Sequence, residues 1–222
     1  MTKAIPTKAE IFCLLDEFPD KVASFANQLF SSGCFAEPEL IAVAKKLVKG
    51  SSSAFQAHLW ESFGRLIRSQ ESPCHSEWFQ LARTRLLDKD ISAEEFGAIR
   101  DFLSDLRVFS AHLGQQSLTD HDSEWDWYVG INHLARTAGK SELDACIKLL
   151  TKAALSESFL VRESVVEALG VLATRSDLSS QDLVPFRLRL DRIVSQISSD
   201  SNQFVHQSLE TVLPLLDVEA HM

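Results

Sequence analysis

One spacing of apolar residues recurs in three stretches of this chain and constrains its fold more than any other feature. In each twelve-residue stretch the core-type residues occupy positions 1, 5, 8, 9 and 12, a spacing called the shared pattern below. It places these residues on one face of an α-helix. The stretches are 55–66, 161–172 and 205–216. Recurrence of one amphipathic helix along a chain predicts a stack of helical repeats, an architecture that commonly serves binding.

The sequence predicts an all-α protein. No segment alternates apolar and polar residues with a period of two between hairpin turns, so β-strands are not expected. Capping-box spacings at residues 7–10 and 92–95, each a hydroxyl followed three residues later by a carboxylate, indicate helix starts. Joining such signals predicts about eleven helices, at residues 7–17, 20–31, 38–48, 52–69, 73–87, 92–113, 123–138, 141–155, 158–174, 180–198 and 201–216.

Three short links predict antiparallel helical hairpins, because a link of two or three residues keeps adjacent helices together. The hairpins join 38–48 to 52–69, 141–155 to 158–174, and 180–198 to 201–216. In each hairpin the second helix carries the shared pattern, whereas helix 92–113 fits it less well because Glu95 replaces the first apolar residue. We expect one domain over 1–222, with a capping hairpin at 1–36, degenerate repeats at 37–140 and two clearer repeats at 141–216.

The second of these stretches resembles the second helix of a HEAT repeat. Val161-Arg162 begins it, and Ala168-Leu169-Gly170 follows at the spacing of that family. The stretches at 55–66 and 205–216 lack this arginine but keep part of the pattern. The resemblance covers residues 37–69 and 141–216. It implies a HEAT-like α-solenoid, a right-handed superhelical stack of antiparallel helix hairpins in which the second helices line a concave face.

Positions 2, 3, 6 and 7 of the shared pattern are predicted to face away from the stack and to form a partner-binding surface. They supply the candidate contact residues Gln56, Trp60, Glu61, Arg162, Glu163, Glu167, His206, Gln207 and Glu210. Trp60 would be an interface anchor, or it would pack beneath the N-terminal cap. Arg162 would contact the partner, or it would bridge to an adjacent repeat. Trp125 and Tyr128 are added as a second candidate group, because they are aromatic residues beside a run of acids.

Position 10 of the shared pattern has a structural interpretation. It is occupied by Gly64, Gly170 and Pro214, residues that disfavour a helix interior. A small or kinked residue here is expected to let neighbouring helices approach closely or to bend the helix.

Acidic residues are concentrated between Asp88 and Asp126. This window holds ten acids and three bases, and it carries −7 of the chain's net charge of −9. Such a field repels phosphate backbones and would speed the approach of a basic partner. The alternative is a solvated face that contacts nothing, because exposed charges contribute little to stability.

No catalytic or metal-binding motif is present in the sequence. The seven histidines lack metal-ligand spacing, and there is no phosphate loop, nucleophile elbow or Cys/His nucleophile context. Asp120, Asp122 and Glu124 resemble the start of a calcium loop, but the required glycine and final glutamate are missing. Acids at a helix N-terminus explain this run better. We therefore expect no cofactor, no metal and no catalytic residue.

The location expected for this chain is the cytoplasm. Its four cysteines form no CxxC pair, which suits a reducing compartment, and no signal peptide precedes the first helix. No apolar run reaches the length that a membrane span requires.

Three functional hypotheses follow. The first is a non-catalytic scaffold that holds a basic protein partner on its concave face and acidic middle region, for example an immunity- or antitoxin-like inhibitor. The second is a HEAT-like DNA glycosylase acting on alkylated bases; the net charge, and a basic cluster (Arg187, Arg189 and Arg192) on a predicted outer helix, argue against nucleic acid. The third is a structural or regulatory subunit of a larger complex.

Overall fold

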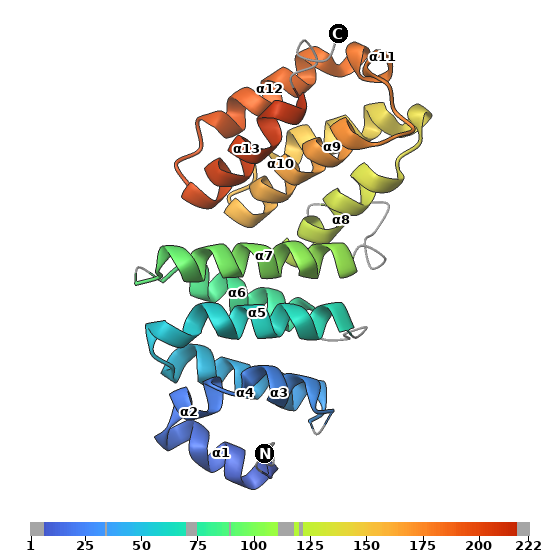
Figure 1. Ribbon diagram of the computed structural model, residues 1–222. Coiled ribbons are helices and arrows are strands. Elements are labelled where there is room, and N and C mark those ends of the chain that lie inside the picture. Colours follow the sequence, from blue (N-terminus) through green and yellow to red (C-terminus); the bar gives the residue numbers. More distant parts are fainter. Residues whose placement is uncertain are drawn as a thin grey trace. The chain divides into compact units, whose positions relative to one another are not determined.

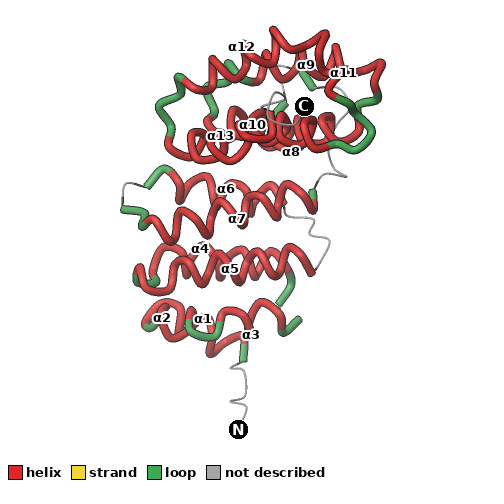
Figure 2. Tube along the Cα trace, turned by 45° about the horizontal axis from the view of Figure 1, so that its top comes forward, coloured by secondary structure: helices red, strands yellow, loops and turns green. Residues whose placement is uncertain are grey.

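A computed structural model describes residues 7–33, 35–69, 75–88, 90–110, 118–119 and 122–216. Within these ranges all regular structure is helical and there is no strand, as Figure 2 shows. The predicted all-α class is therefore confirmed for the described part of the chain. The helices fall into two compact units, Met1–Phe109 and Ser110–Met222, and each is described by itself.

The N-terminal unit contains α1 (Lys8–Glu17), α2 (Pro19–Ala23), α3 (Ala26–Ser31), α4 (Glu37–Gly50), α5 (Ser53–Ser69), α6 (His75–Leu86) and α7 (Ala93–Phe109), labelled in Figure 1. Helix α5 packs lengthwise against α7, and α3 packs against α5. Helix α4 contacts α6, and α6 contacts α7. Trp60 hydrogen-bonds to Glu95, and Arg68 hydrogen-bonds to Asp105. The later residue of α5 thus meets the later residue of α7, so the two helices run parallel.

Aromatic rings form the core of this unit. Phe63 of α5 lies at the centre, with its ring centroid 4.9 Å from that of Phe30, 5.2 Å from Trp78 and 5.4 Å from Trp60. Trp60 in turn lies 5.3 Å from Phe102 of α7. Edge-to-face and tilted ring pairs of this kind stabilise a core beyond the area that they bury. This cluster joins α3, α5, α6 and α7, and so it fixes the position of α7 beside α5.

The C-terminal unit contains α8 (Glu124–Thr137), α9 (Leu143–Ala153), α10 (Phe159–Thr174), α11 (Ser180–Leu183), α12 (Arg187–Ser198) and α13 (Gln203–Leu216), with 3-10 turns at Lys140–Glu142 and Val184–Phe186. Helix α10 lies between α8 and α13 and is largely buried. Its contacts Glu163 to Ser208 and Gly170 to Val212 run in the same sense, so α10 and α13 are parallel. Helices α9 and α12 pack against each other beside this layer.

The close approach expected at position 10 of the shared pattern is confirmed at two glycines. A Cβ atom added to Gly64 would lie 3.0 Å from Oδ2 of Asp105, on α7. One added to Gly170 would lie 3.1 Å from Cγ2 of Val212, on α13. In both units the helix that carries the pattern therefore meets its parallel neighbour at this position.

Two predicted helices are interrupted in the structure. The segment predicted as helix 20–31 is two helices, because the chain turns at Ser24 and Phe25, where the Ser24 hydroxyl donates to the Lys21 carbonyl at 2.7 Å. The segment predicted as helix 180–198 changes to a 3-10 turn around Pro185. Proline has no amide hydrogen and its ring clashes with the preceding turn of an α-helix, so the α-helix restarts only at Arg187.

Candidate functional site

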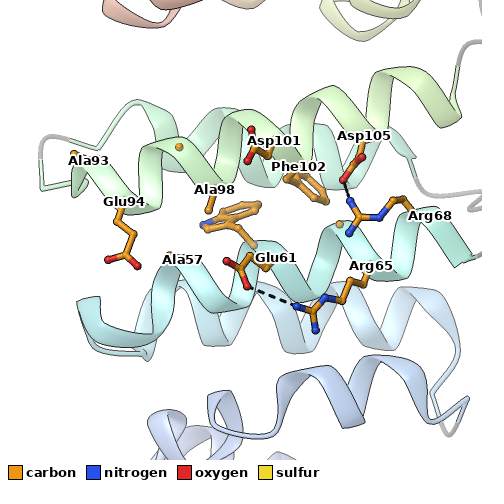
Figure 3. A pocket seen from close by; sticks show the side chains of 13 residues that line it. Ala57, Glu61, Arg65, Arg68, Ala93, Glu94, Ala98, Asp101, Phe102 and Asp105 are labelled. Carbon is orange, nitrogen blue, oxygen red and sulfur yellow. Dashed lines mark hydrogen bonds and ion pairs between the residues drawn. The ribbon is translucent and has the colours of Figure 1, made fainter.

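An open groove of about 550 Å³ lies between the parallel helices α5 and α7 of the N-terminal unit (Figure 3). Small residues face it from both helices, namely Ala57, Gly64, Ala93, Gly97 and Ala98. Trp60 and Phe102 lie beneath them, and both are buried. A Cβ atom added to Gly97 would meet nothing within 4 Å, which shows that the space above this residue is open.

The groove depends on the residues at positions 3 and 6, which the shared pattern does not specify. In α10 these positions are Glu163 and Val166, whose side chains are buried against neighbouring helices. In α5 position 3 is Ala57, which leaves space, and position 6 is Trp60, which lies below the floor rather than within the groove. Small residues on the facing side of α7 complete the depression, and the shared pattern alone did not identify them.

Charged side chains form the rim of the groove. They are Glu61, Arg65 and Arg68 of α5, and Glu94, Asp101 and Asp105 of α7, so carboxylates outnumber guanidinium groups (Figure 3). Arg65 lies 3.8 Å from Glu61, and Arg68 pairs with Asp105. Glu94 and Asp101 are exposed and lie on the same side of α7, where the rim has its excess of negative charge.

Asp105 is the rim carboxylate with a perturbed proton affinity. Burial raises the pKa of its carboxyl above the ordinary value; the positive charge of Arg68 opposes this rise, and the negative charge of Asp101 adds to it. A cation bound near Asp101 and Asp105 would relieve the repulsion between these two carboxylates. The rim is thus electrostatically suited to a positively charged ligand.

Trp60 is a buried residue of the core, so its predicted exposure as an interface anchor is wrong. Its side chain is 0% exposed, and its indole Nε1 donates to Oε1 of Glu95 at 3.3 Å. It packs against Phe102 of α7, with the two ring centroids 5.3 Å apart. The physical reason is the position of α7, which covers the face of α5 that was predicted to meet solvent.

Glu95, which breaks the shared pattern in sequence, occupies a buried position where an ion pair replaces apolar packing. Its two carboxylate oxygens accept hydrogen bonds of 2.7 Å from Nε and Nη2 of Arg85 on α6. Hydrogen bonding to Glu95 raises the pKa of the Arg85 guanidinium, so this group stays charged. Ser92 still caps α7 through a 3.1 Å bond from the Glu95 amide, while the Glu95 side chain points toward Arg85 and Trp60.

Gln56 is also buried, contrary to its prediction as a contact residue. Its side-chain amide donates to the carbonyl oxygens of Val48 at 3.0 Å and Ser51 at 2.9 Å. These carbonyls belong to the end of α4 and to the link before α5, where the backbone lacks helical donors. Gln56 therefore stabilises the α4–α5 turn. Glu61 remains exposed, as predicted, and it is the candidate of α5 that lies on the groove rim.

In the C-terminal unit Arg162 bridges adjacent hairpins, which is the second of the two roles predicted for it. It pairs with both oxygens of Asp200, in the turn before α13, and it donates to the carbonyl oxygens of Ser156 at 2.7 Å and Glu157 at 2.9 Å. The His206 ring nitrogen hydrogen-bonds to the Asp200 carbonyl. Arg162 and His206 are thus occupied in fixing the turns of two hairpins.

Two further candidates of this unit are buried, and their prediction as contact residues is wrong. Glu163 accepts a hydrogen bond of 3.2 Å from Ser208 of α13, because α10 has helices on both sides. Tyr128 is 0% exposed and stacks on Trp125, which is half-buried. Glu167 and Gln207 are half-buried and Glu210 is exposed, so these three remain accessible candidates.

Several carboxylates between Asp88 and Asp126 are already paired within the chain. Glu95 and Asp105 pair with arginines, Ser158 donates to Glu124, and Asp126 accepts from the Ser123 amide at 3.0 Å to cap α8. Part of the calcium-like run, including Asp120, lies outside the described residues. Within the described ranges, no group of three or more His, Cys, Asp or Glu side chains is placed to hold a metal ion.

The chemical groups available in the groove are those of the side chains that line it. Its lining holds carboxylates, guanidinium groups, small residues and buried rings, and among the described residues that line it there is no Ser, Thr, Cys, His or Lys. Within the basic cluster of α12, Arg189 pairs with Asp144 and lies over the Phe186 ring. No described helix combines the length and apolar character needed to cross a bilayer.

No protein-family model matches this chain, and no curated protein matches it either.

The groove residues that sequence reasoning missed are, on α5, Arg65 and Arg68 and, on α7, Ala93, Glu94, Gly97, Ala98, Asp101 and Asp105. A usable signal was present, because Ala57 and Gly64 are seven residues apart and small residues recur in the first half of helix 92–113. Seven residues are two helical turns, so such spacing lays small residues along one side of a helix.

Proposed function

We propose that this chain is a non-catalytic scaffold that holds a basic segment of a partner protein in the groove between α5 and α7. The observation that carries the proposal is the groove itself, which is open, has a floor of small residues and has an excess of carboxylates on its rim. Interfaces are commonly built in this way, from a desolvated apolar centre and a polar rim. An excess of negative charge on the rim selects a cationic partner.

The net charge of −9 supports the same partner class. An acidic protein attracts a basic one over distances near the Debye length, which raises the association rate at low ionic strength. An immunity- or antitoxin-like inhibitor of a basic protein is one specific form of this proposal, and a regulatory subunit of a larger complex is another.

The proposal includes a HEAT-like architecture, a right-handed superhelical stack of helix hairpins. Support comes from each unit separately: helices that carry the shared pattern lie parallel to a neighbouring helix, with an antiparallel helix between them in sequence. Side-by-side burial of one repeated face is the arrangement by which a solenoid builds its core.

The experiment compares three forms of the chain as baits in extracts of the native cell, with captured proteins identified by mass spectrometry. The baits are the wild type, a groove variant with Glu94→Gln and Asp101→Asn, and a control variant with Glu17→Gln and Asp191→Asn. The two variants lose the same charge from exposed positions. We expect one basic protein to be retained by the wild type and the control and lost from the groove variant.

Equal capture of every protein by all three baits would contradict the proposal, and so would a specific partner that is acidic. The same pair of variants should be compared at two salt concentrations, because exposed ion pairs weaken as ionic strength rises.

A further inference from the structure

The spacing of two exposed rim carboxylates carries information about the shape of the partner. One of them, Asp101, also lies 3.9 Å from Arg100 of its own helix, a contact between largely exposed side chains. Glu94 and Asp101 are seven residues apart on α7, and both are exposed beside the groove. Seven residues are two turns of an α-helix, a rise of about 10.5 Å. Ala57 and Gly64 have the same separation on α5, so the floor extends over the same two turns.

We propose that the partner segment is an α-helix that lies along the groove and carries Lys or Arg at two positions seven residues apart. This inference rests on the function proposed above and goes beyond it, because it names the conformation and the charge spacing of the bound segment. The two cations meet Glu94 and Asp101, and the positions between them face the floor.

An extended segment matches this spacing less closely than a helix does. Side chains on one face of a β-strand repeat about every 6.7 Å, so the same-face separations of a strand fall well below or well above 10.5 Å. On an α-helix the seventh residue returns to within about 20° of the first and lies about 10.5 Å along the axis. A helical ligand therefore places both cations on α7 carboxylates at once.

The floor of the groove determines which residue types of the partner fit between its two cations. Ala57, Gly64, Gly97 and Ala98 present little side-chain bulk, and the rings of Trp60 and Phe102 lie beneath. Helices pack at interaxial distances of about 8–10 Å, and the shorter distances require small residues at the contact. The third or fourth residue after the first cation thus faces an apolar floor, and an alanine or other small apolar residue suits it.

The end of the groove near the C-termini of α5 and α7 limits how far the basic pattern extends. Arg65 and Arg68 lie there, paired with Glu61 and Asp105 (Figure 3). A third cation one further turn along the partner helix would meet these guanidinium groups. The preferred ligand is thus a helix with two spaced cations and a neutral or acidic turn at the end that lies near Arg65 and Arg68, and not a uniformly basic segment.

Three fluorescein-labelled, alanine-rich peptides of equal length and composition test this inference by anisotropy titration against the full chain. The first is helical with lysines seven residues apart, and the second is helical with lysines five residues apart, about 140° around the helix. The third keeps the first peptide's lysine spacing but has D-amino acids that abolish its helix. We expect the first to bind about twofold to fivefold more tightly than the others, because each of the others forfeits at least one exposed ion pair.

A groove-filling variant supplies the protein-side test. Gly97→Leu places a side chain in open space above a helix residue, so the fold should persist while the first peptide loses its binding. Ala42→Leu is the matched control, because Ala42 is an exposed alanine of α4, outside the groove. Circular dichroism of both variants checks that helical content is unchanged.

Equal binding of the three peptides, lost in the Glu94→Gln and Asp101→Asn variant, would overturn the helical inference and leave the basic-partner proposal standing. Undetectable binding of all three would overturn the inference as well. The proposed function itself fails only if the bait experiment above also yields no charge-dependent partner. Retention of the first peptide by the Gly97→Leu variant would show that it binds elsewhere, which overturns the inference too.

Discussion

Among single residues, burial and internal hydrogen bonds separate the candidate side chains that a partner can reach from those that it cannot. Trp60 and Glu163 belong to the column that the shared pattern predicted to be exposed, yet each is buried and has a hydrogen-bond partner on the parallel helix beside its own. A buried polar group without a partner is costly, so these pairings indicate a structural role. Glu61, by contrast, is exposed on the groove rim and stays available for contact.

Replacing Trp60 by alanine is expected to destabilise the N-terminal unit by about 3–5 kcal/mol, because it removes a fully buried ring from the aromatic core. Chemical denaturation followed by circular dichroism measures this change. Trp60→Phe serves as the milder comparison, since it keeps a ring in place and loses the hydrogen bond to Glu95. A Trp60→Ala variant with wild-type stability would show that the ring is not part of the core.

At the scale of elements, parallel helices meet through small residues, and the same substitution has opposite effects at two glycines. Gly97 faces open space in the groove, whereas Gly170 lies against Val212 where α10 meets α13. Both glycines are in helices, so alanine improves helix propensity at each by a similar amount. Packing alone distinguishes the two positions.

Gly97→Ala is expected to raise the free energy of unfolding by about 0.5–1 kcal/mol, and Gly170→Ala is expected to lower it, because its new methyl group would lie 3.1 Å from a Val212 methyl. Thermal denaturation of the two variants beside the wild type measures both changes. Stabilisation by both substitutions would mean that α10 and α13 can separate without cost.

The link between adjacent hairpins at Arg162 and Asp200 gives a pH dependence. Burial acts to raise the pKa of the Asp200 carboxyl, but hydrogen bonds from Arg162 and the Asn202 amide lower it below its ordinary value of 3.8. A carboxyl whose pKa is lower in the folded state binds its proton more readily when unfolded. Its contribution to stability is therefore complete at neutral pH and is lost as the pH falls below 3.8 through the folded value.

Asp200→Asn is expected to lower the free energy of unfolding at pH 7 and to reduce the loss of stability between about pH 5 and pH 2. Urea denaturation at a series of pH values measures both effects. Parallel pH profiles for the wild type and the variant would rule out Asp200 as a contributor to acid sensitivity.

For the whole molecule, net charge bears on whether the proposed partner is a basic protein or DNA. The chain carries −9, and Arg189 of its compact basic cluster is held by Asp144 and the Phe186 ring. Binding to nucleic acid derives largely from lysine and arginine side chains that contact phosphates. The balance of charge thus favours a basic protein over DNA.

A mobility-shift assay with duplex DNA, with and without alkylated bases, is expected to show no retarded band even at low salt, where phosphate contacts are strongest. A basic DNA-binding protein run in parallel confirms that the conditions detect binding. A retarded band that disappears as salt is added would favour the glycosylase hypothesis over the scaffold.

Capping and periodicity act over a few residues, so the sequence alone located most of the helices. It placed α1, α5, α10 and α13 within one or two residues of their observed bounds, and it erred at Pro185, where a local rule was overlooked. It also identified Gly64 and Gly170 as contact positions, because a residue without a side chain inside a helix indicates close packing.

Which side chains are buried, and where the groove lies, follows from contacts between helices that are distant in the sequence. Trp60, Gln56 and Glu163 are buried because α7, α4 and the neighbours of α10 cover faces that one helix considered alone leaves open. The groove likewise needs Gly64 of α5 and Gly97 of α7, residues that lie close only after the aromatic core has aligned the two helices. Burial depends on what lies opposite a residue, and that partner is distant in sequence.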